Sequence, residues 1–524
     1  MSAGLDHLVI VPIVVPLATG ALLLLIDERR HAAKAALSLA SVLAQLAAAM
    51  ALVRLADGAA ALVYRLGDWP ARFGIVLVAD RLSAVMVLLS VVLALAALLF
   101  SIARWHRAGP RFHSLVQFLL MGLSGAFLTG DLFNLFVFFE VLLAASYGLA
   151  LHGSGTARVR ASLHYIAVNL TASLLFLIGA SLIYSVAGTL NMADLAARAG
   201  AVAAGDRALL EAGAGLLAIA FLVKAGMWPL CFWLPETYGA ASAPAGALFA
   251  ILTKVGVYSV ARVWLLVFGD AAGDSAGFGG AWLLAGGIVT LTYGLLGVLA
   301  SREMSRLAGY SLLVSSGTLL AAIGSGQPGA TAAALYYLVA STIGVSAFYL
   351  LIELVERARE PGADVLAVTA EVFGDIGDEA PEEEVGPAIP ATMALLGLSF
   401  ACCALLLAGL PPLPGFVGKF GLLAALLEPE PIPLTAWMLL VLLLVSGLAA
   451  IIAMGRAGVR VFWGPGERAI PRVLVIEIAP IVFLLALTGA LTVQAGPAMR
   501  YLEAAAKSLH APDGYVEAVL KAPR

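Results

Sequence analysis

Three lysines and one glutamate lie inside long apolar stretches of the sequence: Lys224, Lys254, Lys419 and Glu140. An ionisable side chain at the centre of a lipid bilayer costs roughly 2.5–3.5 kcal/mol on insertion scales. Four such residues in one chain therefore need a reason. The movement of protons or other ions through the membrane is the most economical one.

Glu140 lies about nine residues into an apolar run that begins at Asp131, which places it roughly 14 Å deep at 1.5 Å per residue. A carboxylate at that depth is stable only if it is paired or protonated. Lys224 is the natural candidate for its partner. The pair either fixes the order of the helices or opens and closes, and an opening pair would control the proton affinity of the lysine.

Lysine suits such a switch better than arginine. Burial lowers the pKa of a lysine side chain by up to several units and a nearby carboxylate raises it again, whereas an arginine stays charged. The sequence indicates that every deep cation is a lysine, while the basic residues of the polar loops are almost all arginines. This segregation indicates groups that titrate.

Lys254 has the hydroxyl residues Thr253, Tyr258 and Ser259 close to it in sequence, and their side chains can hold water. The alternative is a lysine that reaches to the membrane interface. Apolar residues extend far on both sides of Lys254, which disfavours that alternative.

Two apolar stretches contain helix-breaking residues beside a lysine. Lys419 follows the proline-rich turn 411–415, and Lys224 is followed by Gly226 and Pro229. Proline removes a backbone hydrogen bond, and the carbonyl groups freed at such a break can hold water or a cation. We therefore predict two broken helices.

Composition sets the class of protein. Of the 524 residues, 62% are hydrophobic and only 12% are charged, against about 25% charged in a soluble domain. The net charge of −3 gives no basic surface for nucleic acid. The three cysteines, Cys231, Cys402 and Cys403, lack metal-ligand spacing, and the sequence has no nucleotide-binding or haem motif. We expect no cofactor and no metal.

This composition and the apolar stretches of the sequence predict an all-α polytopic membrane protein with about fourteen spans of ~20 apolar residues. The spans fall at residues 5–26, 33–56, 79–103, 112–130, 131–151, 162–187, 207–231, 241–267, 277–300, 304–324, 329–355, 388–428, 434–455 and 473–495.

Loop charge predicts the orientation. The loops after odd-numbered spans hold Arg29, Arg30, Lys34, Arg104, Arg107, Arg111, Arg158, Arg160, Arg302, Arg306, Arg357, Arg359, Arg456, Arg460, Arg468 and Arg472. The other loops hold only Arg54, Arg65, Arg72, Arg81, Arg198 and Arg207. By the positive-inside rule the first set is cytoplasmic, and both termini are external.

Two segments are not spans. Residues 64–80 have a turn at Asp68 to Pro70 between β-prone flanks, which predicts an external hairpin. Residues 375–387 are acidic and contain proline, which is typical of a flexible connector.

The remaining acidic residues and histidines have ordinary explanations. Asp80 and Asp131 stand at helix starts. An N-cap or interface role is one interpretation of these two residues, and ion binding is the other. Glu353 and Glu477 lie near cytoplasmic helix ends and indicate interface or partner contacts. His164, early in the sixth span, is either a capping or interface residue or a relay member.

Three segments carry a resemblance to a known family: WLPETYGAASAPAGALFAILTKVGVYSVAR, GDLFNLFVFFEVLLAASYGL and GDWPARFGIVLVADRLSAVM. They resemble the D component of Mrp-type multisubunit Na⁺/H⁺ antiporters, which is related to the antiporter-like proton-pumping subunits of respiratory complex I. The resemblance covers nearly the whole chain, and TGDLFNLFVFFE resembles the D branch in particular.

The resemblance implies a fold of fourteen helices with two inverted five-helix repeats, helices 4–8 and 9–13, in which helices 7 and 12 are broken. It divides the chain into an N-terminal unit with the hairpin (1–111), a first repeat (112–268), a second repeat (269–457) and a last helix with a tail (458–524). Lys224 and Lys419 would occupy equivalent places in the two repeats.

The resemblance also implies site residues. The essential glutamate of the family falls on Glu140 and its central lysine on Lys254. Many relatives have histidines where this chain has Tyr238 and Ala340 or Ser341. A relay in this chain would therefore use water and the hydroxyl groups of Tyr258, Ser259, Tyr336, Tyr337, Ser341 and Thr342.

The expected function is that of a proton-translocating subunit of a Na⁺ (or K⁺)/H⁺ antiporter in the bacterial inner membrane. It is a transporter subunit rather than an enzyme, and it needs partner subunits of the A, B, C, E, F and G types. The alternatives are a proton-pumping subunit of a complex I-like or hydrogenase redox complex, and a scaffold whose charges only order helices.

Overall fold

The computed structural model describes residues 7–357, 390–463 and 473–521. The acidic segment predicted as a connector, 375–387, lies outside these residues. The helices are η1 (His7–Val9), α2 (Val11–Leu25), α3 (His31–Asp57), η2 (Leu66–Asp68), α4 (Arg81–Ala103), η3 (Trp105–Arg107), α5 (Phe112–Leu128), α6 (Leu132–Ala150), α7 (Thr156–Ala187), α8 (Met192–Ala199), α9 (Ala204–Ala225), α10 (Trp233–Ala240), α11 (Ala243–Val267), η4 (Asp270–Ser275), α12 (Gly280–Ala300), α13 (Met304–Gly324), α14 (Pro328–Arg357), α16 (Pro390–Ala408), α17 (Pro414–Leu426), α18 (Leu434–Gly458), η5 (Val459–Trp463), α19 (Val475–Val493), α20 (Ala495–His510) and α21 (Asp513–Lys521).

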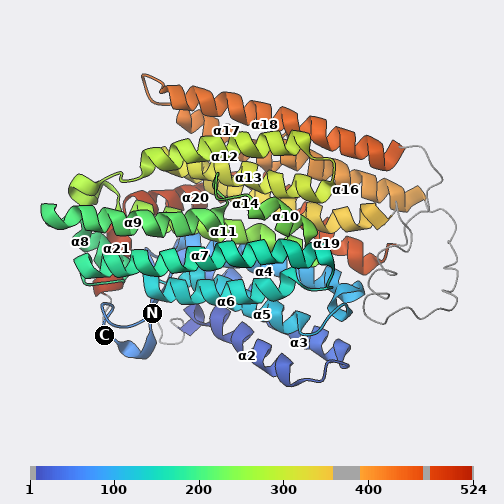
Figure 1. Ribbon diagram of the computed structural model, residues 1–524, viewed down its shortest axis with the longest axis horizontal. Helices are drawn as coiled ribbons and strands as arrows, with labels where there is room; N and C mark the ends of the chain where they lie inside the picture. Colours follow the sequence, from blue (N-terminus) through green and yellow to red (C-terminus); the bar gives the residue numbers. More distant parts are fainter. Residues whose placement is uncertain (1–6, 358–389, 464–472, 522–524) are drawn as a thin grey trace.

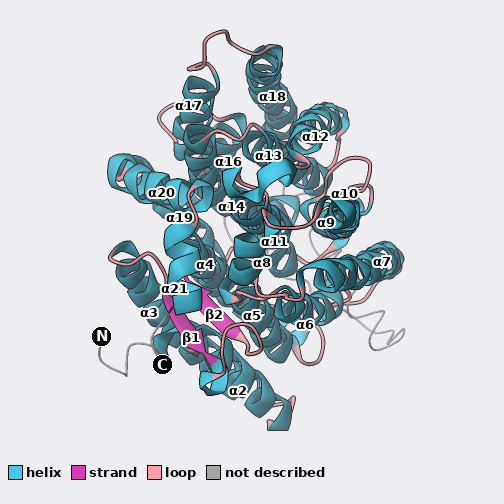
Figure 2. Cartoon of the chain, turned by 90° about the vertical axis from the view of Figure 1, so that its left-hand side faces the viewer, coloured by secondary structure: helices cyan, strands magenta, loops and turns pink. Residues whose placement is uncertain are grey.

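The long helices lie side by side along the longest axis of the molecule (Figure 1). Viewed end-on, α4, α11, α13 and α14 occupy the middle and the other helices surround them (Figure 2). Burial follows this arrangement: 94% of the most apolar window of α11 is buried inside the chain, against 28% for α19. The central helix therefore carries its polar residues away from lipid.

The two ends of the bundle differ. One, here called the hairpin end, holds α8 and α21 (Figures 1 and 2). Strands β1 (Leu62–Arg65) and β2 (Val76–Ala79) pair there as an antiparallel hairpin, with Leu62 opposite Ala79. The predicted hairpin is therefore confirmed. The opposite end, here called the arginine-rich end, carries the loops 26–30, 104–111, 151–155 and 301–303.

The predicted spans agree closely with the observed helices. Twelve of the described helices are long and apolar enough to cross a membrane, and α2, α5 and α17 are shorter apolar helices. The fold is therefore an all-α polytopic membrane bundle. The number of fourteen crossings stays a prediction, because it counts α16 and α17 as the single broken span 388–428 and includes the shorter helices α2 and α5.

Both predicted breaks are present, and each begins at a glycine. Gly226 ends α9 with φ +73°, and Gly409 ends the helix α16 with the same φ of +73°. A positive φ costs glycine little, so each glycine can end its helix and turn the chain. The second half of the later span then starts at Pro414, whose missing N–H costs nothing at a helix start. Lys224 precedes its break and Lys419 follows its own, so the two lysines flank the breaks from opposite sides.

Helix starts confirm two of the capping predictions. Asp80 caps α4 by accepting a hydrogen bond from the Ser83 amide at 2.9 Å. Asp131 caps α6 by accepting one from the Asn134 amide at 2.9 Å. His164 lies on the exposed face of α7.

Candidate functional site

The three deep lysines are almost completely enclosed by the chain. Lys254 is 0% exposed, Lys224 6% and Lys419 7%. Within the described residues, no carboxylate oxygen lies within 4.0 Å of their Nζ atoms. Lys34 is also buried, but its Nζ atom lies 2.7 Å from Glu28 at the arginine-rich end. In the part of the chain that the structure describes, the deep lysines thus differ from Lys34 in lacking a fixed counter-ion.

Glu140 and Lys224 are close but do not touch as an ion pair. The hydroxyl of Ser173 on α7 donates a hydrogen bond to Glu140 Oε1. Lys224 Nζ lies 4.8 Å from the ring centroid of Phe139, the residue before Glu140. In the described part of the chain this Nζ atom has no hydrogen-bond partner. The predicted direct pair is therefore not formed in this conformation, and a proton crossing between the two groups needs water or movement.

Lys254 begins a line of hydrogen-bonded groups at the centre of the bundle. Its Nζ atom donates to Ser315 Oγ on α13 at 2.8 Å, and Ser315 Oγ lies 2.9 Å from Ser341 Oγ on α14. Tyr337 stands one turn before Ser341, and both line a cavity of about 20 Å³. A cavity of that size has room for about one water molecule.

Lys419 lies near Tyr337, beyond the hydrogen-bonded part of this line. Its Nζ atom donates to the carbonyl oxygen of Ala408, the last residue of α16, at 3.1 Å and lies 6.0 Å from the ring centroid of Tyr337. A helix C-terminus carries unsatisfied carbonyl groups and favours a cation. A Cβ atom added to Gly409 would lie 2.8 Å from Lys419 Cδ, so the glycine also makes room for the lysine stem.

The arrangement can pass a proton along Lys254, Ser315, Ser341, Tyr337 and Lys419 with the help of water. Hydroxyl groups both donate and accept hydrogen bonds, so each can take a proton from one side and release one to the other. The groups come from α11, α13, α14 and α17, and α14 packs against each of the other three helices. Hydrogen bonds join Lys254 to Ser315 and Ser315 to Ser341, whereas Lys419 bonds to the Ala408 carbonyl, so water would have to complete the line between these two lysines.

Four of the predicted relay hydroxyls point elsewhere. Tyr336 donates to the Leu491 carbonyl on α19 at 3.0 Å, and Tyr258 donates to the Phe127 carbonyl on α5 at 2.6 Å. Ser259 and Thr342 donate to carbonyl groups of their own helices. Two hydroxyl groups that were not predicted contact the ionisable residues instead: Ser315 accepts from Lys254, and Ser173 donates to Glu140. Their only signal in the sequence is a serine within an apolar helix, which several other residues share.

We expect Ser341→Ala to lower the transport rate by up to about tenfold, because an ordinary hydrogen bond contributes up to ~1.4 kcal/mol. The matched control is Thr342→Val, since the neighbouring hydroxyl bonds only to Leu338 of its own helix at 2.6 Å. Both variants are compared by proton movement in vesicles. Equal rates in the two variants would remove Ser341 from the line.

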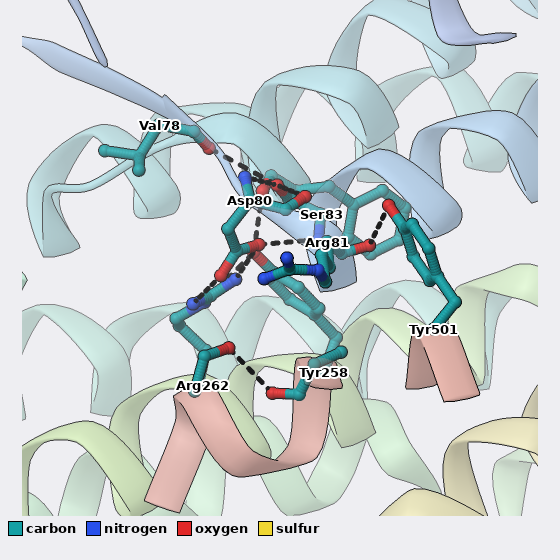
Figure 3. A network of polar contacts seen from close by, with 10 residues as sticks. Val78, Asp80, Arg81, Ser83, Tyr258, Arg262 and Tyr501 are labelled. Atoms are coloured by element: carbon teal, nitrogen blue, oxygen red, sulfur yellow. Dashed lines mark hydrogen bonds and ion pairs between the residues drawn. The ribbon is translucent and has the colours of Figure 1, made fainter. Parts of the chain in front are cut away.

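A buried ion pair lies near the hairpin end of α11 (Figure 3). Arg262 donates from its two terminal nitrogens to the carboxylate of Asp80, at 2.6 and 2.7 Å, and from Nε to the Tyr258 hydroxyl at 3.3 Å. Its guanidinium also lies 5.2 Å from the ring centroid of Tyr515 on α21. The sequence-based segregation of lysine from arginine is therefore wrong at one position: Arg262 is a buried arginine, 4% exposed.

Electrostatics hold Asp80 ionised. Burial disfavours the charged carboxylate of Asp80, but the Arg262 charge and the hydrogen bonds from Arg262 and Ser83 offset that cost. The pair therefore stays ionic at neutral pH, and each charge is matched by the other. Such a pair fixes geometry and does not titrate.

A second ionic cluster lies at the arginine-rich end. Glu477 on α19 is 0% exposed and lies 2.7 Å from Arg357, which also pairs with Glu353 on the same helix, α14. Trp105 Nε1 donates to Glu353 at 2.6 Å, and Arg104 Nε lies 3.7 Å from Glu477. These glutamates make internal ion pairs, so their predicted assignment to interface or partner contacts is not needed.

The fold and these contacts define a polytopic membrane protein with a buried line of lysines and hydroxyls. Residues 129–448 match the family model described as "NADH:quinone oxidoreductase/Mrp antiporter, TM". The chain belongs to this family.

Relatives and solved structures agree with that assignment. The chain is 59% identical to the D component of a probable K⁺/H⁺ antiporter of Rhizobium meliloti (strain 1021), over 100% of this chain and 99% of that one. It is 34% identical to the D component of a Na⁺/H⁺ antiporter of Alkalihalophilus pseudofirmus, over 99% and 100%. A chain in the "Structure of Mrp complex from Dietzia sp. DQ12-45-1b" superposes with a TM-score of 0.83 at 26% identity, covering 99% of this chain and 100% of that one. A chain of respiratory complex I from Thermus thermophilus shares the fold, with a TM-score of 0.75 at 23% identity over 98% and 99%.

Proposed function

We propose that this chain is the proton-translocating D-type component of a multisubunit monovalent cation/proton antiporter. The observation that carries the proposal is the buried line from Lys254 through Ser315 and Ser341 to Lys419, which holds titratable groups without fixed counter-ions among the described residues. The names of the relatives support the same class. Transport rather than catalysis is the role of the chain.

In this proposal protons pass from Glu140 and Lys224 to Lys254 and on to Lys419. Glu140 controls the proton affinity of Lys224, Lys254 links the two halves of the bundle, and Lys419 is the terminal group beside the second break. The two-repeat division into residues 1–111, 112–268, 269–457 and 458–524 is part of the same proposal, as is the placement of both termini outside the cell in a bacterial inner membrane.

Glu140 supports the need for partner subunits. It is partly exposed on α6, on the same face as Phe133 and Val137, which are 53% and 41% exposed. A carboxylate deep in a membrane does not face lipid. We infer that a neighbouring subunit covers this face, which agrees with partners of the A, B, C, E, F and G types.

The transported cation is monovalent, and the names of the relatives give both K⁺ and Na⁺. We place K⁺ first, because the relative that shares 59% identity carries that name. The complete set of subunits, expressed together in vesicles, is tested with each cation for release of an imposed proton gradient. Copurification with iron–sulfur or flavin subunits instead of antiporter subunits would favour the alternative, a pumping subunit of a redox complex.

Lys224→Met and Glu140→Gln test the first half of the path. Each is expected to lower antiport about 10²-fold, the scale of a lost proton-transfer group, while the subunits still copurify. Glu517→Gln, on the exposed surface of α21, is the control and keeps full activity. Full activity in Lys224→Met would favour a scaffold, in which the deep charges only order helices.

A further inference from the structure

The cavity beside the line from Lys254 is bounded by α12, α13, α14, α16 and α18. It has a volume of about 20 Å³, and four hydroxyl-bearing residues line it: Ser311, Tyr337, Ser341 and Ser446. Among the described residues that line it, none is charged. Tyr337 and Ser341 belong to the line already described. Ser311 on α13 and Ser446 on α18 have no part in that line, so their place in the wall of the cavity is unexplained.

The hydroxyl groups of these two serines can each accept a further hydrogen bond. Ser311 is 8% exposed and donates to the Leu307 carbonyl at 2.9 Å. Ser446 is 4% exposed and donates to the Leu443 carbonyl at 2.8 Å. A serine hydroxyl has one proton to donate and two lone pairs that accept. Each serine therefore uses its proton within its own helix and can accept from a molecule in the cavity that it lines.

One water molecule fits the cavity in both size and chemistry. A cavity needs about 10–15 Å³ to hold a water, and the water needs two to four polar partners. The volume of about 20 Å³ meets the first condition, and the four hydroxyl-bearing residues meet the second. A purely apolar cavity of this size would stay dry.

The cavity adjoins the break beside Lys419. Its wall includes Leu407, and the next residue, Ala408, accepts the hydrogen bond from Lys419 Nζ at 3.1 Å. A Cβ atom added to Gly447, the residue after Ser446, would lie 2.8 Å from the Ala408 carbonyl oxygen. Glycine at this position therefore lets α18 approach the break closely, and Ser446 lies beside it.

We propose that Ser311 and Ser446 are positioning residues that hold a water molecule in this cavity, and that the water passes protons between Ser341 and Tyr337. This role rests on the proposed function, because it concerns the same proton line. The water accepts one proton from Ser341 and releases one to Tyr337, whose ring centroid lies 6.0 Å from Lys419 Nζ. A protonated water has three protons to donate and a neutral one has two. The lone pairs of the two serines therefore favour the protonated form.

Gly344 on α14 offers a way to fill the cavity without removing a hydroxyl group. It lines the cavity, and a Cβ atom added to it would lie 3.5 Å from Leu406 Cβ, the nearest atom outside its own stretch of helix. This is an ordinary van der Waals distance, so alanine fits there. Its methyl group would occupy the place of the water. Alanine also favours a helix over glycine, so the variant should be at least as stable as the parent protein.

Proton movement by the complete complex in vesicles tests the role of the water. Gly344→Ala is expected to lower the rate about 10²-fold, the scale of a lost proton-transfer group. Ser446→Ala is expected to lower it up to about tenfold, the scale of one hydrogen bond. The matched control is Gly455→Ala on α18, where an added Cβ atom meets no atom of the described residues within 4 Å. It makes the same chemical change away from the cavity and should keep the rate of the parent.

A solvent isotope effect separates the loss of the water from a loss of structure. The rate of each variant is measured in ordinary and in heavy water, together with the midpoint of thermal unfolding. If proton transfer at the cavity limits the rate, the ratio of the two rates should be larger in Gly344→Ala and Ser446→Ala than in the parent. A smaller amount of assembled complex would lower both rates alike and leave their ratio unchanged.

Lys254→Met separates the water site from the proton line as a whole. An inactive Lys254→Met beside a parent-like rate in Gly344→Ala overturns the water site and leaves the proposed function in place. A slower Gly344→Ala with the isotope ratio of the parent overturns the water site as well. Full transport by Lys254→Met overturns the proton line and the water site together.

Discussion

Replacing Lys254 with methionine is expected to abolish antiport, by about 10²-fold or more, while the subunit still assembles. Proton-transfer groups typically contribute 10²–10⁴-fold, and Lys254 is the link between the two halves of the proposed path. Methionine keeps the apolar stem of lysine, and the loss of the ammonium leaves Ser315 still bonded to Ser341 at 2.9 Å. Proton movement in vesicles and copurification of the partner subunits are measured together.

Two comparisons give that result its meaning. Lys507→Met removes an exposed lysine of α20 and should leave transport unchanged. Lys254→Arg keeps a positive charge that does not release its proton, so it should also be inactive if titration matters. Full transport by Lys254→Arg would show that charge alone suffices, and full transport by Lys254→Met would falsify the path.

Breaking the pair between Asp80 and Arg262 is expected to have the largest effect on stability. Removing one partner of a buried ion pair leaves an uncompensated charge and costs about 3–5 kcal/mol. Arg262→Met and Asp80→Ala should each lower the midpoint of thermal unfolding of the detergent-purified complex by several degrees. Glu517→Ala, at the exposed pair with Lys521, should leave that midpoint unchanged.

A double variant separates the pair from its surroundings. Because the joint removal of Asp80 and Arg262 leaves no lone charge, it should cost less than the sum of the single changes. Additive single effects would show that the two groups act independently.

The spans were predictable because apolar length alone defines a membrane helix. The observed α13 (Met304–Gly324) matches the predicted bounds 304–324 at both ends. The amphipathic helices α8, α20 and α21 escaped prediction. Their polar faces break the apolar run, and their helical form depends on the bundle surface against which they pack, α21 for example against α8 and β1.

The residue types of the site were visible in the sequence, but their contacts were not. Burial of Lys224 follows from its apolar neighbours, whereas its separation from Glu140 depends on how α6 and α9 are rotated by packing. Ser315 was hidden among other serines of the same helix. Arg262 gave the same signal as Lys254, a charge in an apolar stretch, and its partner Asp80 lies 182 residues away in sequence.

The C-terminal helices impose an order on biosynthesis. Arg65 donates to the Val519 carbonyl across 454 residues, and Tyr501 reaches the Val53 carbonyl across 448. The N-terminal segments therefore gain these hydrogen bonds only after the last part of the chain has left the ribosome. The guanidinium of Arg262 lies against the rings of Tyr258 and Tyr515. Before α21 is in place, it has the Tyr258 ring but lacks the Tyr515 ring. A chain cut short before α21 would leave that end of the bundle open, a defect that cellular proteases can detect.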